Sequence, residues 1–150
     1  MSRVFYDSKL AKFLLFDGYT TIMLFGFIFT KYKKLMPSTL RHEKIHCKQY
    51  EDCLIAFLLP FILLGILHSW WWMILYPLMF YILYGIEWAI SMIYNTIRML
   101  IVDKRFHPIR ANDKAYYASA FEMEAYDNEG KIDYLKTRKR FAFIKYYGKV

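Results

Sequence analysis

Two histidines and a glutamate stand in the spacing of a metal site, because His42-Glu43-Lys44-Ile45-His46 is an HExxH motif. Residues four apart share one face of a helix, so both imidazoles can bind one Zn²⁺ ion. Glu43 lies one step round from His42, where it can take a proton from a water and deliver it to a leaving amine. The motif predicts a zinc hydrolase, and two solvated surface histidines are the simpler alternative.

A third protein ligand is expected downstream, in the helix predicted around Phe121-Glu122-Met123-Glu124-Ala125-Tyr126. Glu122 and Glu124 lie about 200° apart around a helix, so only one of them can face the metal. The residues alone leave this choice open, since an exposed helix charge is the commonest fate of a glutamate. Candidates to support the site or the substrate are Gln49, Glu87, Glu124 and Tyr126, and an oxyanion could be stabilised by Tyr116, Tyr117 or Tyr126.

The HExxH motif must be carried by a helix, and Pro37-Ser38-Thr39 predicts where that helix begins, with Ser38 or Thr39 as its cap. Charged residues then repeat at three- and four-residue steps and form a solvated stripe: Arg41, Lys44, Lys48 and Glu51. A second stripe lies on a different face and contains His42, His46, Gln49 and Cys53.

The segment before this helix has two interpretations. Strand-forming residues favour one or two β-strands over residues 19–32, near a membrane surface. The rival is a third membrane-spanning helix over residues 13–30, which Asp17 and Gly18 would interrupt and which would separate the basic residues on its two sides. The first 16 residues lack the pattern of a signal peptide.

An excess of apolar residues points to a membrane. The chain is 57% hydrophobic and contains 13 Phe, 14 Tyr and 4 Trp, more than one small core needs. Residues 54–67 and 70–102 are almost free of charge, with Glu87 and Arg98 as exceptions, and predict two antiparallel spanning helices with Trp70 to Trp72 at the turn. Basic residues flank both outer ends, so both should face the cytoplasm. A soluble core that contains a helical hairpin is the alternative.

The net charge of +8 suits anionic lipid or nucleic acid. Because the basic residues flank apolar spans, lipid explains them and nucleic acid is not an expected partner. Residues 113–150 predict a mostly helical tail with a break at Gly130. Residues 136–140 with the aromatics that follow resemble a segment pressed on anionic headgroups, and a solvated basic helix end with a few core aromatics is the alternative. Cys47 and Cys53 are expected to be free thiols in a reducing compartment.

His42-Glu43-x-x-His46 followed by a helical F-E-x-x-A segment resembles the gluzincin metallopeptidases, most closely membrane-embedded ones such as CAAX prenyl endopeptidases and heat-shock-induced membrane metallopeptidases. Over most of its length the chain is similar to small bacterial membrane proteins that combine four motifs. Here these motifs are Gly18-Tyr19-Thr20, the HExxHxxQ helix from His42 to Gln49, Ile86-Glu87-Trp88, and Ala115-Tyr116 through Tyr126. The HExxH and F-E-x-E-A motifs are the specific ones.

The resemblance implies that His42 and His46 are zinc ligands, that Glu43 is the general base, and that Glu122, three residues before Ala125, is the third ligand. The membrane endopeptidases usually have Asp after that alanine to support a zinc histidine, and Tyr126 stands here instead. Either another acid does that job or the site is weaker. In those enzymes a strand beside the site pairs with extended substrate, a part that residues 19–32 could play.

The sequence therefore predicts one mainly α, membrane-embedded, zincin-like domain over residues 1–150. Its parts are an N-terminal strand region (1–37), the HExxH helix (38–53), a membrane helical hairpin (54–102) and a cytoplasmic helical tail with the glutamate helix (103–150). The expected function is a membrane-bound zinc metallopeptidase that hydrolyses peptide or membrane-protein substrates at the cytoplasmic face of a bacterial inner membrane. A non-catalytic membrane adaptor, with zinc or without metal, is the alternative.

Overall fold

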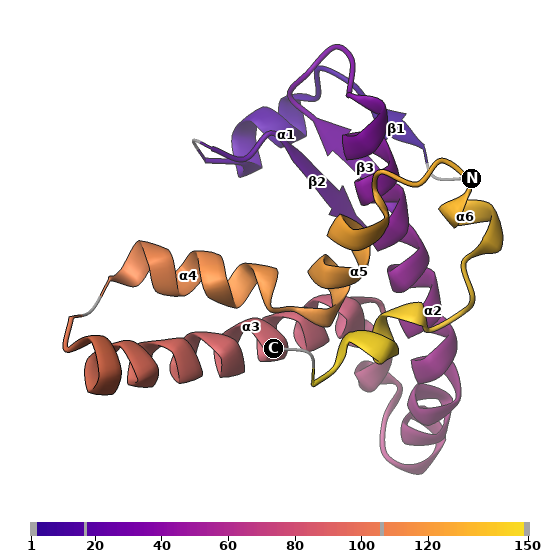
Figure 1. The fold of residues 1–150 in the computed structure, drawn as a ribbon. Helices are drawn as coiled ribbons and strands as arrows, with labels where there is room; N and C mark the ends of the chain where they lie inside the picture. Colours follow the sequence, from indigo (N-terminus) through magenta and orange to yellow (C-terminus); the bar gives the residue numbers. More distant parts are fainter. Residues whose placement is uncertain (1–2, 17, 106, 149–150) are drawn as a thin grey trace.

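Most of the chain is helical, and one small sheet lies at its N-terminal end (Figure 1). The computed structural model describes residues 3–16, 18–105 and 107–148. The fold class predicted from the sequence, mainly α with an N-terminal strand element, is confirmed. Its elements are β1 (Val4–Phe5), α1 (Lys9–Leu14), β2 (Thr21–Leu24), β3 (Phe27–Thr30), α2 (Pro37–Leu67), α3 (Met79–Arg98), α4 (Pro108–Tyr117), α5 (Ala120–Asn128) and α6 (Tyr134–Thr137), with short 3₁₀ turns at Trp70–Ile74, Tyr76–Leu78 and Ala142–Tyr146 and a π turn at Met99–Asp103.

The sheet has the order β1-β3-β2, so β2 is an edge strand. β2 pairs with β3 in antiparallel register, with Thr21 opposite Thr30. Phe25 and Gly26 join them with positive φ angles of 51° and 81°, as a two-residue hairpin turn requires. The predicted strands are thus confirmed and the rival spanning helix over residues 13–30 is wrong, whereas β1 and α1 were not predicted. Asp17 lies outside the described residues.

α2 is one continuous helix of 31 residues that includes both the HExxH motif and the first apolar stretch. Its N-cap is Met36, which makes no side-chain capping bond, so the predicted cap at Ser38 or Thr39 is wrong. Pro37 occupies the first turn instead, where its fixed φ suits a helix and its missing N–H leaves no donor unsatisfied. The stripe of His42, His46, Gln49 and Cys53 is buried. Of the stripe predicted to be solvated, Lys48 and Glu51 are exposed, whereas Arg41 and Lys44 are half-buried.

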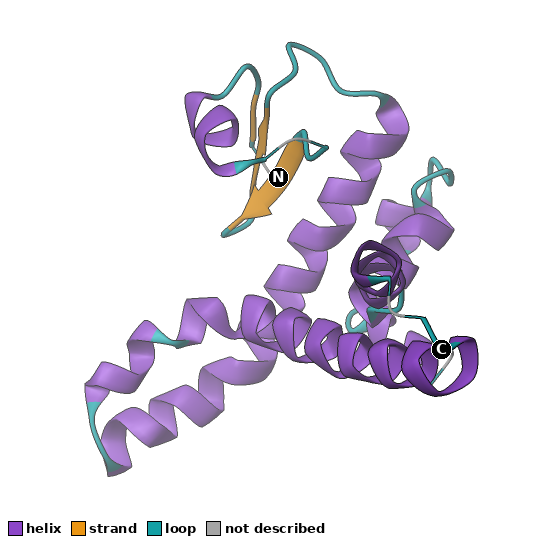
Figure 2. Cartoon of the chain, turned by 90° about the vertical axis from the view of Figure 1, so that its left-hand side faces the viewer, coloured by secondary structure: helices purple, strands orange, loops and turns teal. Residues whose placement is uncertain are grey.

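Three exposed tryptophans mark the turn between α2 and α3. Trp70 packs over Gly65, where an added Cβ would lie 2.7 Å from its ring, so the bare backbone lets the turn close. Beyond the turn α3 slants away from α2 in both Figure 1 and Figure 2 and lies alongside α4. The predicted pair of long helices is therefore present but splayed.

Two helical stretches, Pro37–Leu67 and Trp70–Asp103, are long and apolar enough to cross a membrane. Length and composition alone are weak evidence for a span, because the core helix of a soluble protein passes the same test. Only 28% of the 18-residue apolar segment in the first stretch, and 6% of that in the second, is buried inside the protein.

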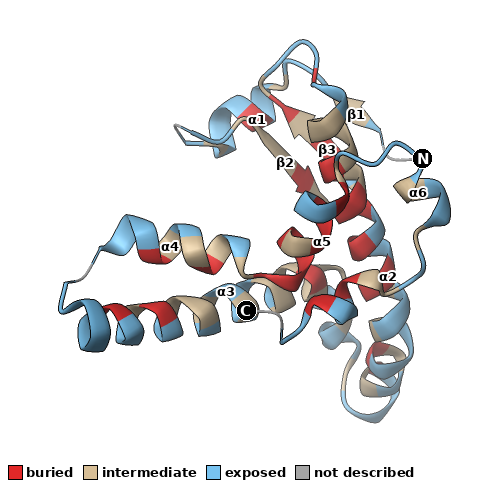
Figure 3. Ribbon diagram, in the orientation of Figure 1, coloured by how far each residue is buried: buried red, intermediate tan, exposed pale blue. Residues whose placement is uncertain are grey.

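Buried residues gather where α2 and α5 meet the sheet and the C-terminal segment (Figure 3). Phe121 of α5 is fully buried and its ring packs on Phe80 of α3 and Phe143 of the C-terminal turn, with centroids 5.0 and 4.6 Å apart. α5 ends at Asn128, so the predicted break at Gly130 is confirmed. This packing fixes α5 against α2, and these two helices carry the candidate site.

Candidate metal centre

His42, His46 and Glu122 converge between α2 and α5. The two Nε2 atoms of the histidines are 3.0 Å apart. The carboxylate oxygens of Glu122 lie 3.4 Å from His42 Nε2 and 3.3 Å from His46 Nε2. The three residues are 7%, 7% and 2% exposed, and their ligand atoms all lie within 4.8 Å of one another, so the group could hold a metal ion.

The chemistry of this group fits zinc. A tetrahedral zinc with bonds of about 2.0–2.1 Å places two ligand atoms roughly 3.3 Å apart, close to the separations of 3.0 to 3.4 Å found here. Glu122 Oε2 is buried and has no hydrogen-bond partner within the described part of the chain, as a carboxylate oxygen reserved for a cation would be. Two histidines and one glutamate are also a donor set of catalytic zinc sites, which keep a fourth position open.

His42 is held by two contacts, one from Tyr126 of α5 and one from Glu129, the residue that caps the C-terminal end of α5. Its Nδ1 lies 2.9 Å from Glu129 Oε2, and because a carboxylate accepts, this contact directs Nε2 to the metal group. The ring of Tyr126 packs on the imidazole with centroids 4.7 Å apart. Glu129 therefore supplies the acid that the sequence lacks after Ala125, and Tyr126 supplies a packing surface.

His46 is held from within its own helix. Its Nδ1 lies 2.7 Å from Oε1 of Gln49, one turn further along α2. Gln49 is fully buried, and its Nε2 donates to the main-chain oxygen of Phe121 at 2.9 Å and to Glu124 at 3.1 Å. The structure thus places Gln49 against a candidate ligand, as the sequence suggested.

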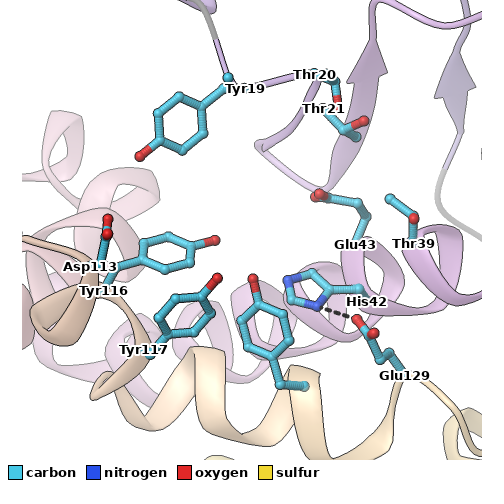
Figure 4. A pocket seen from close by; sticks show the side chains of 12 residues that line it. Tyr19, Thr20, Thr21, Thr39, His42, Glu43, Asp113, Tyr116, Tyr117 and Glu129 are labelled. Carbon is cyan, nitrogen blue, oxygen red and sulfur yellow. Dashed lines mark hydrogen bonds and ion pairs between the residues drawn. The ribbon is translucent and has the colours of Figure 1, made fainter. Parts of the chain in front are cut away.

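Glu43 lies next to the metal group and faces a cleft. A cavity of about 410 Å³ opens there, and in Figure 4 the Glu43 carboxylate points into it towards the strand side, with the tyrosine rings on the opposite wall. A second, more apolar cavity of about 280 Å³ adjoins it and is also lined by His42 and Glu43. Glu43 is only 9% exposed, so the surrounding residues restrict the orientation of its carboxylate.

Tyrosines surround Glu122. Tyr84 donates its hydroxyl to Glu122 Oε1 at 3.0 Å. Burial raises the pKa of Tyr116 and of Tyr126, and the negative charge of Glu122 raises both further, so these phenols stay protonated and can donate hydrogen bonds. Burial opposes the charge of Glu122 itself, but the adjacent imidazoles outweigh it and hold the pKa of this carboxyl well below its usual range.

Glu124 and Glu87 lie outside the metal group. Glu124 is fully buried, pairs with Arg138 and contacts Gln49. Glu87 accepts hydrogen bonds from Ser119 Oγ at 2.8 Å and from the main-chain N–H of Ala120 at 2.9 Å, and a further one from Tyr147. The sequence made Glu87 a candidate to support the metal site or the substrate. Instead it binds the N-terminus of α5, where free N–H groups favour an anion.

Two residues that contact the metal group, Glu129 and Tyr84, were not predicted as site residues. Glu129 stands seven residues after Glu122, two helical turns on, so a helical projection already places both on one face. Tyr84 reaches the site from α3, which no pattern in the sequence connects to α5.

Comparison with known proteins identifies no relative. No family model matches the chain, and neither the curated proteins nor the solved structures contain a significant match.

Removing the acceptor of His42 should weaken metal binding. Glu129→Ala is expected to lower zinc affinity about 10- to 100-fold, because the imidazole loses the group that orients it. Glu129→Gln keeps an acceptor oxygen and should lose less. Zinc affinity is measured by competition with a chromophoric chelator. Glu51→Ala is the control, since Glu51 is an exposed glutamate of α2 that pairs with Lys48. Equal affinities for Glu129→Ala and Glu51→Ala would contradict this role.

Proposed function

We propose that the chain is a membrane-bound zinc metallopeptidase of the HExxH gluzincin type. The observation that carries the proposal is the convergence of His42, His46 and Glu122 beside Glu43, at the wall of a cleft. In this proposal the two histidines and Glu122 hold the zinc ion and Glu43 is the general base. Glu122 stands 76 residues after His46 in the chain, so the fold brings together more than the isolated HExxH motif provides.

The reaction proposed is hydrolysis of a peptide bond. When bound, zinc supplies a Lewis acid that polarises the scissile carbonyl and acidifies the attacking water. Glu43 takes the proton of that water and returns it to the leaving amine. Tyr116 and Tyr126 are protonated donors on the cleft wall, and in this proposal they bind the developing oxyanion.

The edge strand supports a peptide as the substrate. β2 pairs with β3 on one side only, and its residues line both cavities: Thr21 lines both, and Ile22 to Leu24 line the apolar one. An extended peptide can add to such an edge through main-chain hydrogen bonds. Its side chains would then meet an apolar cavity on one side of Glu43 and a more polar cleft on the other.

A bilayer is the proposed surrounding. Support comes from the two long apolar helices and from the little cover that the protein gives them. Outward residues of α2 and α3, such as Leu59, Ile66 and Ile90, are more than 60% exposed, a surface that lipid would cover. The turn at Trp70 to Trp72 carries no Lys or Arg, whereas basic residues flank both outer ends, so we propose that the site faces the cytoplasm of a bacterium.

A non-catalytic adaptor is the competing function. The small size of the chain, the lack of a visible substrate domain and Tyr126 in place of a supporting acid favour it, and the contact between Glu129 and His42 weakens the last of these three. Catalytic activity distinguishes the two functions, since both allow a bound metal.

The proposal is tested with the full chain purified from membranes in detergent. One zinc per chain is expected, together with cleavage of a mixed library of synthetic peptides detected by mass spectrometry. Chelation should abolish cleavage, and added zinc should restore it. Protein without stoichiometric zinc, or protein that leaves alkaline-washed membranes, would refute the corresponding part of the proposal.

A further inference from the structure

A buried ion cluster lies behind the metal group, between α2, α5 and the C-terminal segment. Arg138 Nε donates to Glu124 Oε1 at 2.6 Å, and Arg138 Nη1 donates to Asp52 Oδ2 at 2.7 Å. The side chains of Arg138, Glu124 and Asp52 are 4%, 0% and 3% exposed. Arg138 belongs to the basic run that the sequence assigned to lipid headgroups, so the structure gives this arginine a different partner.

Glu124 is saturated with hydrogen-bond donors. Its Oε1 accepts from Tyr134 at 2.8 Å and from Arg138 Nε at 2.6 Å. Its Oε2 accepts from Arg138 Nη2 and from Gln49 Nε2, both at 3.1 Å. A carboxylate offers about four lone-pair sites, and all are used. Arg138 and Tyr134 occupy three of these sites, and the fourth, on Oε2, faces Gln49 and accepts from a donor there.

Glu124 and the main-chain oxygen of Phe121 together fix the orientation of the Gln49 amide. Because Glu124 requires a donor, the NH₂ group of Gln49 faces it, and the same NH₂ group also donates to the main-chain oxygen of Phe121. Oε1 is left for His46 Nδ1 at 2.7 Å. An amide oxygen only accepts, so the hydrogen-bond network assigns the proton of His46 to Nδ1 and leaves the Nε2 lone pair for a metal.

We propose that Arg138 is a positioning residue of the metal centre, which acts through Glu124 and Gln49 to hold His46 in the tautomer that binds metal. The inference rests on the metal-binding part of the proposed function and is independent of peptidase activity. The C-terminal segment thereby acts on the metal centre, although the side chains of Glu124 and Gln49 lie between Arg138 and His46.

Isosteric variants of the full chain in detergent test this inference. Glu124→Gln keeps size but adds an NH₂ group, which favours the flipped amide of Gln49 and the Nε2–H tautomer of His46. Arg138→Met removes the donors of Glu124, and Arg138→Lys keeps a charged donor. Asp52→Asn is the matched control, because it alters the same ion cluster but none of the hydrogen bonds that connect Glu124, Gln49 and His46. Zinc affinity is measured by chelator competition, and imidazole ¹⁵N NMR of the metal-free protein at alkaline pH reports the tautomer.

We expect zinc affinity to fall about 10- to 100-fold in Glu124→Gln and Arg138→Met, with an NMR shift towards Nε2–H, and to be mostly retained in Arg138→Lys and Asp52→Asn. If Arg138→Met does not fold, Glu124→Gln decides, because Arg138 keeps Asp52 as a partner there. Unchanged affinity and tautomer in Glu124→Gln, or an equal loss in Asp52→Asn, would overturn the inference. Wild-type protein that binds no zinc yet shows the Nδ1–H tautomer would refute the proposed function while the positioning of His46 stands.

Discussion

Glu43→Gln is expected to keep one zinc per chain and to lower the turnover of a cleavable peptide by about 100- to 10,000-fold. The carboxylate of Glu43 faces the cleft next to the metal group and makes no part of that group. Glutamine preserves its size but cannot take the proton of the attacking water. Steady-state kinetics should therefore show the loss mainly in kcat, and metal analysis of the same preparation should show no change.

Glu51→Gln is the matched control for this prediction, because it is the same substitution on an exposed position of α2. It should leave both rate and zinc content unchanged. Wild-type turnover in Glu43→Gln would exclude Glu43 as the general base. An identical phenotype of the wild type and this variant in cells, with no cleavage by either protein, would instead favour the adaptor function.

The parts of the site that depend on local sequence could be predicted. The four-residue step from His42 to His46 fixes a shared helix face wherever the helix packs, and the same projection relates Gln49 to His46. The strand formers after Thr20 likewise gave the right element, because hairpin geometry is set by adjacent residues. The choice between Glu122 and Glu124 came from the resemblance, and the structure brings Glu122 to the histidines.

The parts that depend on tertiary packing could not be predicted. Arg138 looks like a solvated or lipid-facing cation because its neighbours are Lys136, Lys139 and Arg140, and only the fold brings Glu124 and Asp52 around it. The contact of Tyr84 with Glu122 depends on how α3 lies against α5, and hydropathy does not specify the angle between α2 and α3. Hydropathy locates apolar stretches but carries no information on which side chains meet across helices.

Glu122→Ala is expected to abolish stoichiometric zinc binding, with a loss of affinity greater than about 100-fold, since a ligand should cost more than a residue that only supports one. It leaves His42 and His46 as the protein ligands, fewer than catalytic zinc sites use. Zinc per chain after gel filtration and affinity by chelator competition measure the effect. The fold should survive, because α5 is also held by the buried ring of Phe121 and by the ion pair of Glu124 with Arg138, and neither contact involves Glu122.

Glu124→Ala provides the contrast, because the same substitution two residues away should act mainly on stability. It leaves the buried Arg138 without one of its two carboxylates, and breaking a buried ion pair in this way costs about 3–5 kcal/mol. The unfolding temperature should therefore fall well below that of Glu122→Ala, while zinc binding is weakened and not lost. The reverse pattern, with zinc lost in Glu124→Ala and kept in Glu122→Ala, would exchange the two roles, since only one of these side chains can face His42 and His46 from α5.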